Sequence, residues 1–565
     1  MNENEANSLS RRHWLQRMSV PALALAGAGF IPQGAKAAPA GPGKADANLQ
    51  GAKVYNIRDF GAKGDGKTND SAAVQAAIDA CNTDKGGMVL VPAGDFIIGT
   101  VELKSNVTLH LSAQGRLLGS TRREDYQAGK GVPPGNGNLV LLYAVSATNL
   151  SIEGRGTIDG NGGSFYNGLG DGTSPGGTGK GNTDRPHLLI FFKCTGLLLR
   201  DTFFTRSAYH CMRILQCRQV HIDGVRIYNR INKNNDGFHI NSCEYVHISN
   251  CDVQCQDDAC ALFGSNVFVT VTNCTFSTRW SIFRFGSGSS KNITVSNCLI
   301  YDTYGCPIKI SAGRAQIENL CFSNIVMKNV TGPISIAFGR PNRGNGSSGA
   351  ATGAPSFLRN VSFNGIRATV VTQPVNHPDI PFDVKVNNGE QYSCITLNGM
   401  DDAFLEDISF TDVHVSYAGG GTAAMAGKAV PAVNAEYFGV WAEEPFGPPA
   451  YGLYARNVKG LRLQNVRFDY DQPDARPAMV FDNVQDALVN GLSAQGSPET
   501  SLLRFVNSKD VLLTATRVLT PAPVFLQVTG ASSDGIIIDG GDLRKAAKST
   551  VLADGAGEKS VVVRI

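Results

Sequence analysis

The sequence has little net charge of either sign, and it lacks the features that define nucleic-acid-binding and membrane proteins. The formal net charge is only +3 over 565 residues, whereas nucleic acid and acidic membrane surfaces are bound by concentrated basic fields. After the N-terminal segment, no apolar run is long enough to span a bilayer. We therefore predict neither a nucleic-acid partner nor a membrane partner.

The sequence also lacks the spacing of a zinc site, because no Cys-x-x-Cys occurs and the nine histidines are scattered. The thirteen cysteines are an odd number, which disfavours complete disulfide pairing. Cys251, Cys274 and Cys298 recur at intervals of 23 and 24 residues, each directly after an asparagine. This spacing predicts a ladder of small buried thiols, and we expect no metal and no cofactor.

The N-terminal segment has the order of an export signal. Residues Ser10–Gln16 form a twin-arginine motif, a weakly apolar stretch follows over residues 20–31, and Ala35-Lys36-Ala37 offers small residues for a signal peptidase. We predict a twin-arginine signal at residues 1–37, a linker at 38–51, and export to the periplasm or the medium. The alternative is a chance Arg-Arg pair before a short membrane anchor.

Short β-branched runs recur along the chain at intervals of 23 to 26 residues. Most of them alternate with period two, which is the pattern of a β-strand. The runs include Val220-His221-Ile222, Val246-His247-Ile248, Val269-Thr270-Val271 and Ile293-Thr294-Val295. Asparagine tolerates left-handed turns, and it holds similar offsets in successive repeats at Asn250, Asn273, Asn297 and Asn324.

This repeat predicts an all-β solenoid, a single-stranded parallel β-helix over residues 52–565, rather than a leucine-rich repeat or a propeller. Residues 72–80 are typical of a short amphipathic helix capped by Asp70 or Ser71, which we expect to cover the first coil. Four insertions are too long for tight turns, and we expect them to wall a groove. They span residues 160–183, 339–355, 371–391 and 419–449.

Three aspartates carry the strongest functional signal. Asp236 follows two asparagines, and the pair Asp257 and Asp258 begins 21 residues later, which is close to one repeat. If the repeat is one coil, the carboxylates lie on neighbouring rungs of one surface. Clustered carboxylates repel one another, so a fold that keeps them together indicates acid and base catalysis. The alternative is an acidic turn that binds a cation or faces solvent.

Two parts of the sequence resemble a known family. Tyr55–Asp70 resembles the opening of bacterial pectin-active β-helix proteins, and Asn235-Asp236-Gly237 with Asp257-Asp258 resembles the acidic motifs of glycoside hydrolase family 28, the polygalacturonases. The resemblance covers nearly the whole mature chain. It implies a right-handed β-helix and hydrolysis of a plant cell-wall pectin, either polygalacturonan or rhamnogalacturonan.

The resemblance implies that Asp257 is the general acid and that Asp236 and Asp258 activate water, with inversion at the sugar carbon. Breaking a glycosidic bond does require a proton donor and a base or nucleophile. Rungs of a β-helix lie about 4.8 Å apart, whereas inverting enzymes hold their carboxylates roughly 6.5–9.5 Å apart. Distance alone would therefore favour retention.

The chain departs from the family beside these acids. The histidine of the family's Gly-His-Gly falls on Ser281, and its Arg-Ile-Lys falls on Lys309-Ile310-Ser311. The strand pattern instead predicts one column of outward residues on successive rungs, namely Arg213, His239, Ala261, Arg284 and Lys309. These cations suit the carboxylates of uronate sugars, or they only neutralise the aspartates.

Trp280 and Tyr304 are candidate stacking faces for sugar rings, with a core or turn position as the alternative. Our leading hypothesis is an exported, monomeric glycosidase with a polysaccharide or oligosaccharide substrate. A second is a polysaccharide lyase that uses Arg284 or Lys309 as its base, and a third is a non-catalytic glycan-binding β-helix. The sequence leaves open the sugar and whether cleavage is endo or exo.

Overall fold

The computed structural model describes residues 51–133, 137–165, 185–286, 288–313, 315–338, 356–375, 377, 388–430, 441 and 443–564. The chain divides into one unit at residues 1–49 and another at residues 50–565, and all described structure lies in the second. The predicted export signal at 1–37 and all but the last residue of the predicted linker lie outside the described residues.

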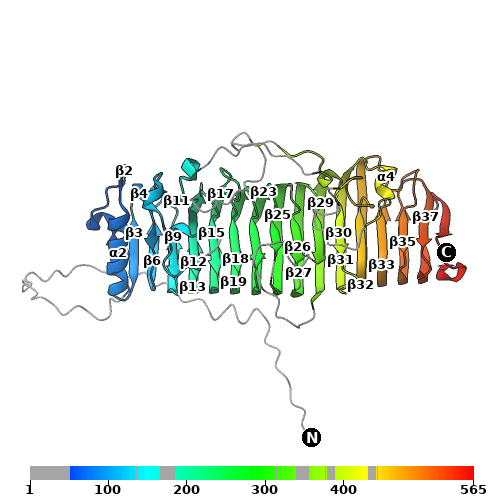
Figure 1. The fold of residues 1–565 in the computed structure, drawn as a ribbon, viewed down its shortest axis with the longest axis horizontal. Helices are drawn as coiled ribbons and strands as arrows, with labels where there is room; N and C mark the ends of the chain where they lie inside the picture. The colour runs from blue at the N-terminus through cyan, green and yellow to red at the C-terminus, as the bar shows by residue number, and fades with distance from the viewer. Residues whose placement is uncertain are drawn as a thin grey trace, which may run out of the picture. The chain divides into compact units, whose positions relative to one another are not determined.

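The described part of the second unit is built mainly from strands that pair in parallel with strands of the next coil (Figure 1). In the central part of the chain each strand pairs with the third strand along, so three ladders run side by side. This is the arrangement that the repeat of about 24 residues predicts. Among the described strands, β8 (Gln127–Ala128) pairs with β9 in the antiparallel sense.

The first ladder carries the candidate site. Its strands are β5 (Val101–Glu102), β9 (Leu139–Val145), β12 (His187–Phe192), β15 (Met212–Leu215), β18 (Phe238–Asn241), β21 (Cys260–Phe263), β24 (Phe283–Phe285), β26 (Ile308–Ala312), β28 (Ile334–Phe338), β30 (Ile395–Asn398), β32 (Leu453–Gln472), β33 (Met479–Asn490), β35 (Leu503–Val506), β37 (Ala522–Thr529) and β39 (Ala546–Ala553).

The other two ladders complete the coils. The second contains β1 (Val54–Asn56), β3 (Gly87–Val91), β6 (Val107–Leu111), β10 (Thr148–Glu153), β13 (Thr195–Arg200), β16 (Arg218–Asp223), β19 (Glu244–Ser249), β22 (Val267–Thr272), β25 (Lys291–Thr303), β27 (Gln316–Val330), β29 (Phe357–Val370), β31 (Leu405–Gly419), parts of β32 and β33, β36 (Lys509–Val518), β38 (Asp534–Asp542) and β40 (Val561–Arg564). The third contains β2 (Asp65–Asn69), β4 (Gly94–Ile98), β7 (Gly115–Gly119), β11 (Thr157–Asp159), β14 (Phe203–Thr205), β17 (Arg226–Asn229), β20 (Asp252–Cys255) and β23 (Thr275–Thr278), and it then joins β25; β34 (Ser493–Ala494) pairs with β32 and β36.

The register between coils places similar side chains directly above one another. Val246 pairs with Val269, which pairs in turn with Ile293, and all three side chains are buried. All thirteen cysteines are free thiols and twelve of them are buried, as predicted. The N–H of Cys251 donates to the Cys274 Sγ over 3.5 Å, which joins two rungs of the predicted ladder.

The predicted turn asparagines adopt left-handed backbone conformations. Their φ values are 57° at Asn250, 53° at Asn273, 55° at Asn297 and 53° at Asn324. The last two of these asparagines also bond to each other, because Asn324 Nδ2 donates to Asn297 Oδ1 over 3.2 Å. The turn ladder read from the sequence is therefore confirmed in these coils.

Helices are few and short apart from α2 (Ser71–Thr83), which packs against β1, β3, β5 and β6. Among the described residues, the others are α4 (Ala423–Ala426) and the 3-10 turns η2 (Ile57–Phe60), η3 (Arg123–Asp125), η4 (Gly162–Phe165), η6 (Glu390–Tyr392) and η8 (Glu558–Ser560). The expectation of a side-chain cap on α2 was wrong. Asp70 instead accepts hydrogen bonds from the N–H groups of Lys63 and Gly64, and Ser71 Oγ bonds to Asn69.

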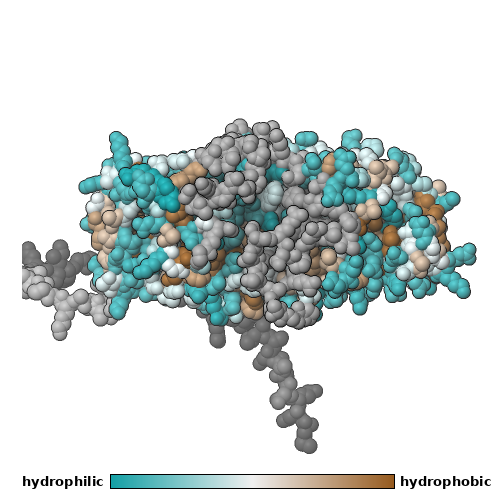
Figure 2. Space-filling model, viewed as in Figure 1, coloured by the Kyte–Doolittle hydropathy of each residue, from teal (hydrophilic) through white to brown (hydrophobic). Residues whose placement is uncertain are grey.

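The described surface that faces the viewer in Figure 2 is mostly hydrophilic, with scattered apolar patches. Among the described helices, none is both long and apolar enough to cross a membrane. The predicted insertion at 339–355 lies outside the described residues, and the other three are described only in part.

Candidate active site

The three predicted acids converge where β18 and β21 begin. These strands pair in register from Phe238 and Cys260 onward, so the residues just before them also lie side by side. The N–H of Gly237 donates to the carbonyl of Asp258 over 3.0 Å, and the N–H of Asp257 donates to the carbonyl of Asn235 over 3.2 Å. The structure thus brings Asp236, Asp257 and Asp258 onto adjacent rungs.

The three carboxylates differ in exposure. The side chains of Asp236 and Asp258 are each 7% exposed, whereas Asp257 is half-buried. Asp257 Oδ2 accepts a hydrogen bond from Asn234 Nδ2 over 3.1 Å, and its Oδ1 accepts from the N–H of Asp258 over 2.9 Å. Asp257 is therefore the acid that a substrate reaches most easily.

Burial changes the protonation of the other two acids. It raises the pKa of Asp236 well above the usual value, and the nearby charge of Asp257 raises it further. Burial also raises the pKa of Asp258 to about 7, although Arg284 acts in the opposite direction. A carboxyl group with the pKa of Asp258 exchanges its proton near neutral pH, which suits acid and base chemistry.

The predicted outward column is present in the register of the first ladder. Arg213 pairs with His239, Ala261 with Arg284, and Arg284 with Lys309. Arg284 Nε lies 3.7 Å from Asp258 Oδ2, and Lys309 is buried. The Nε and Nη1 atoms of Arg213 are buried and make no hydrogen bond to any described residue. A uronate carboxylate is one group that could satisfy them.

The candidate aromatic residues behave differently from each other. Trp280 is half-buried, with the Arg279 guanidinium 5.4 Å from its ring centre. Tyr304 is fully buried and its hydroxyl accepts the N–H of Val375 over 2.7 Å, so its ring packs in the interior and has no face for a sugar. Ser281 is also buried, and its hydroxyl donates to the carbonyl of Gly305 over 3.0 Å.

Four aromatic residues that the sequence analysis did not select lie near Asp236, in a row that also contains His239. A continuous row of rings, each 4.3–5.0 Å from the next, runs past the acid. Its members are His187, Tyr209, His210, His239 and Phe263. The Arg185 guanidinium lies 4.3 Å from the Tyr209 ring centre.

One signal for His210 was available in the sequence. His210 stands two residues before β15, as Asp236 and Asp258 stand two residues before β18 and β21. Equivalent offsets place the three side chains on consecutive rungs of one column, and Ser281 follows them before β24. Counting back from each strand start would have identified this column.

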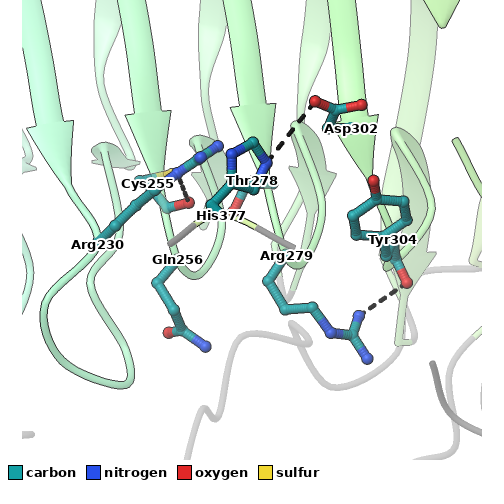
Figure 3. A pocket seen from close by; sticks show the side chains of 8 residues that line it. All are labelled: Arg230, Cys255, Gln256, Thr278, Arg279, Asp302, Tyr304 and His377. Carbon is teal, nitrogen blue, oxygen red and sulfur yellow. Dashed lines mark hydrogen bonds and ion pairs between the residues drawn. The ribbon is translucent and has the colours of Figure 1, made fainter. Parts of the chain in front are cut away.

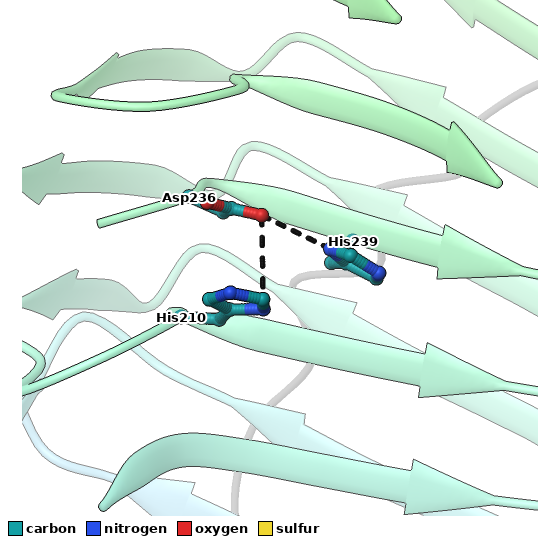
Figure 4. A group of neighbouring side chains, drawn as sticks. All are labelled: His210, Asp236 and His239. Atoms are coloured by element: carbon teal, nitrogen blue, oxygen red, sulfur yellow. Dashed lines mark hydrogen bonds and ion pairs between the residues drawn. The ribbon is translucent and has the colours of Figure 1, made fainter. Parts of the chain in front are cut away.

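Two imidazoles contact Asp236 (Figure 4). His239 Nδ1 lies 3.0 Å and His210 Nδ1 lies 3.6 Å from Asp236 Oδ2, and the three ligand-type atoms lie within 4.8 Å of one another. Two histidines and a carboxylate are a donor set that transition metals accept. However, the cations of Arg185, Arg213 and Arg284 act on the same carboxylate and oppose a further positive charge, so we assign no metal here.

A small pocket lies beside the turn between β20 and β21 (Figure 3). It is lined by Arg230, Cys255, Gln256, Thr278, Arg279, Asp302, Tyr304 and His377. The carbonyl of Asp257 accepts the Thr278 hydroxyl and, over 3.1 Å, the Cys255 thiol. The backbone of Asp257 is thereby fixed from the inner side of the coil.

A buried ion pair joins a distant segment to this edge of the site. Arg279 Nη1 lies 3.4 Å from Glu390 Oε1, and the two side chains are 10% and 1% exposed. Arg279 Nη1 also donates to the carbonyl of Tyr304 over 2.8 Å. The turn η6 is therefore anchored next to Trp280.

The family model for glycosyl hydrolases family 28 matches residues 81–420, which is more than half of the chain and includes every residue of the site described above. The chain belongs to this family. The predicted resemblance to family 28 is thereby confirmed, and residues 421–565 lie beyond the matched segment.

Curated relatives of this family 28 chain include Polygalacturonase-2 of Solanum lycopersicum, which is 28% identical over 310 residues, or 52% of this chain and 64% of that protein. The Exo-poly-alpha-D-galacturonosidase of Dickeya chrysanthemi is 42% identical over 125 residues, or 20% of each chain. The chain covers less than two thirds of the length of the first curated relatives that it matches.

Two solved structures of family-related enzymes share the fold of this chain. The exopolygalacturonase from Thermotoga maritima aligns with a TM-score of 0.56 at 19% identity, covering 74% of this chain and 92% of its own. The family 28 exopolygalacturonase from Yersinia enterocolitica aligns with a TM-score of 0.56 at 18% identity, covering 78% of both chains. At this identity the likeness supports the β-helical fold alone.

Proposed function

We propose that the protein is a glycosidase that hydrolyses an acidic pectic polysaccharide, either polygalacturonan or rhamnogalacturonan. The observation that carries this proposal is the convergence of Asp236, Asp257 and Asp258 on adjacent rungs, with burial that raises the pKa of Asp236 and Asp258. Membership of family 28 and the polygalacturonase names of the relatives support it.

In the proposed mechanism Asp257 protonates the glycosidic oxygen as the bond to the leaving sugar breaks. Its partial exposure supports this role. Asp236 and Asp258 remove a proton from the attacking water, whose oxygen then bonds to the anomeric carbon from the opposite face and inverts it. The base role requires these two carboxyls to be ionised, so the proton that burial favours must leave before each turnover.

The substrate would lie along the outward column beside the acids. Uronate carboxylates pair with Arg213, Arg284 and Lys309, because Arg presents two parallel N–H donors and Lys a single compact charge. His239 contributes a polar ring, and Trp280 offers the exposed part of its indole to a sugar face.

The proposal extends to the rest of the chain. The coil is right-handed, and α2 covers its N-terminal end because an open coil would expose apolar strand surface. Residues 1–37 are a twin-arginine signal, 38–51 a linker, and 52–565 the catalytic domain, which acts as an exported monomer without a cofactor.

The decisive experiment uses purified protein and three sets of oligomers: galacturonans, rhamnogalacturonans and neutral glucans. We expect saturated products, detected by mass, from one of the first two sets, and loss of turnover by at least about 100-fold in Asp257→Asn. The matched control is Asp84→Asn, which makes the same chemical change at an exposed aspartate and should leave turnover unchanged.

Other outcomes would point to the other classes of function. Products with an ultraviolet-absorbing double bond would indicate a lyase, and binding of glycans without turnover would indicate a binding module. Cleavage of neutral glucans alone would show that the outward column beside the acids does not bind uronate carboxylates. Proton NMR of the first product anomer would test inversion.

A further inference from the structure

Asp236 has an unusual environment for a catalytic base. It is buried, and among the described residues its carboxylate has two neighbouring imidazoles but no backbone N–H donor. An ionised carboxylate in such a place needs a hydrogen-bond donor to remain charged.

The geometry favours His239. Its Nδ1 lies 3.0 Å from Asp236 Oδ2, within hydrogen-bonding distance, whereas His210 Nδ1 at 3.6 Å is too far. Asp236 stands two residues before β18 and His239 is the second residue of that strand, so the entry into β18 sets the contact. His210 stacks on the His239 ring with centres 4.9 Å apart and planes inclined by 24°, which holds the ring plane in place.

We propose that His239 is a positioning residue for Asp236: its Nδ1–H donates to Oδ2 once the carboxyl has lost its proton, which stabilises the ionised form and aims it at the attacking water. This deepens the proposed function and rests on it. The chain lacks a histidine at position 281, and the imidazoles instead reach the acids from the preceding rungs. His210 supports the arrangement by packing and makes no hydrogen bond with its Nδ1 among the described residues.

The charges around the pair agree with a neutral His239. Burial lowers the pKa of His239 to about 3, and Arg213 lowers it further. A neutral imidazole carries one N–H, and opposite an ionised Asp236 that hydrogen must be on Nδ1. The titratable and charged groups that face the pair are Arg185, His187, Tyr209, His210, Arg213, Asp257, Asp258 and Arg284.

Two substitutions separate positioning from packing. His239→Asn keeps an N–H donor near the place of Nδ1, whereas His239→Leu fills similar space without a donor. We expect His239→Leu to lower kcat by about 10- to 100-fold, the effect of losing a hydrogen bond to a charged group, with a smaller change in KM. The acid limb of the pH–rate profile should move up by about one pH unit, and His239→Asn should restore most of both.

The matched control is His247→Asn, which changes an exposed histidine on β19 that bonds to Thr270. It should leave the rate and the pH profile unchanged. Equal losses in His239→Leu and His239→Asn, or an acid limb that does not move in His239→Leu, would overturn the proposal. Circular dichroism spectra and melting temperatures of all variants establish that they fold.

A second measurement does not depend on turnover. Infrared difference spectra against Asp236→Asn isolate the carboxylic acid band of Asp236, whose disappearance with rising pH reports its ionisation. The band should persist to higher pH in His239→Leu than in the wild type. If the wild type cleaves no glycan but the band persists to higher pH in His239→Leu, the proposed function fails and the positioning role stands. If glycan is cleaved and the band disappears at the same pH in His239→Leu and in the wild type, the positioning role fails.

Discussion

Arg284 Nε lies 3.7 Å from Asp258 Oδ2, and this guanidinium is the strongest influence that lowers the pKa of the carboxyl. Burial acts in the opposite direction and prevails, so that the pKa of Asp258 rises to about 7. The protonation of Asp258 therefore depends on the balance between its burial and the charge of Arg284.

The first prediction concerns the pH dependence of the reaction. Asp236 and Asp258 act as bases only when both are ionised, and the pKa of Asp258 is about 7, so kcat/KM should fall as the pH drops below about 7. Initial rates on a short galacturonan between about pH 4 and pH 9 measure this limb. A rate that instead falls above about pH 7 would mean that Asp258 donates the proton, and the roles of Asp257 and Asp258 would be exchanged.

The second prediction concerns Arg284 itself. Arg284→Met removes the charge that opposes burial, so the pKa of Asp258 should rise further and the acid limb should move to higher pH. The KM for a uronate substrate should rise about tenfold if the same guanidinium binds a carboxylate. Arg218→Met, which removes an exposed cation from the second ladder, should change neither value.

A third prediction concerns stability. The folded-state pKa of Asp258 is about 7, above the value of about 3.9 in unfolded chains, so the native state binds more protons between these values and loses stability as the pH rises through this window. Asp258→Asn removes this loss, which lowers the free energy of unfolding by on the order of 4 kcal/mol at most. Denaturant unfolding should show the variant to be more stable than the wild type at about pH 8 but similar at about pH 4.

The fourth prediction tests the buried ion pair between Arg279 and Glu390. Glu390→Gln leaves the Arg279 charge in a buried place without its carboxylate, which typically destabilises a protein by about 3–5 kcal/mol. We also expect KM to rise, because the anchored turn adjoins Trp280. The exposed pair of Lys53 and Asp84 provides the control, since Asp84→Asn should hardly change the melting temperature.

The fifth prediction concerns the thiols. Because twelve of the thirteen cysteines are buried and all are free, a thiol reagent should modify Cys321 alone in the native protein and all thirteen after denaturation. A reducing agent should leave the melting temperature unchanged. Modification of many more than one thiol in the native protein would contradict the buried ladder formed by Cys251, Cys274 and Cys298.

Much of the fold could be predicted because a β-helix repeats a local pattern. The period-two runs fixed which residues face inward, and the spacing of about 24 residues fixed which runs lie side by side. The column of Arg213, His239, Ala261, Arg284 and Lys309 followed from those two facts, and the observed register contains it. Tyr304 could not be decided in the same way, because its burial depends on a segment more than 70 residues away.

The sequence by itself determined the coil, the ladders of thiols and asparagines, and the approach of Asp236 to Asp257 and Asp258, because each depends only on spacing along the chain. The tertiary structure decided which acids are buried, how far Arg284 offsets that burial, and which imidazole bonds to Asp236. These depend on the exclusion of water and on contacts between side chains from different rungs, and neither is encoded in a local period.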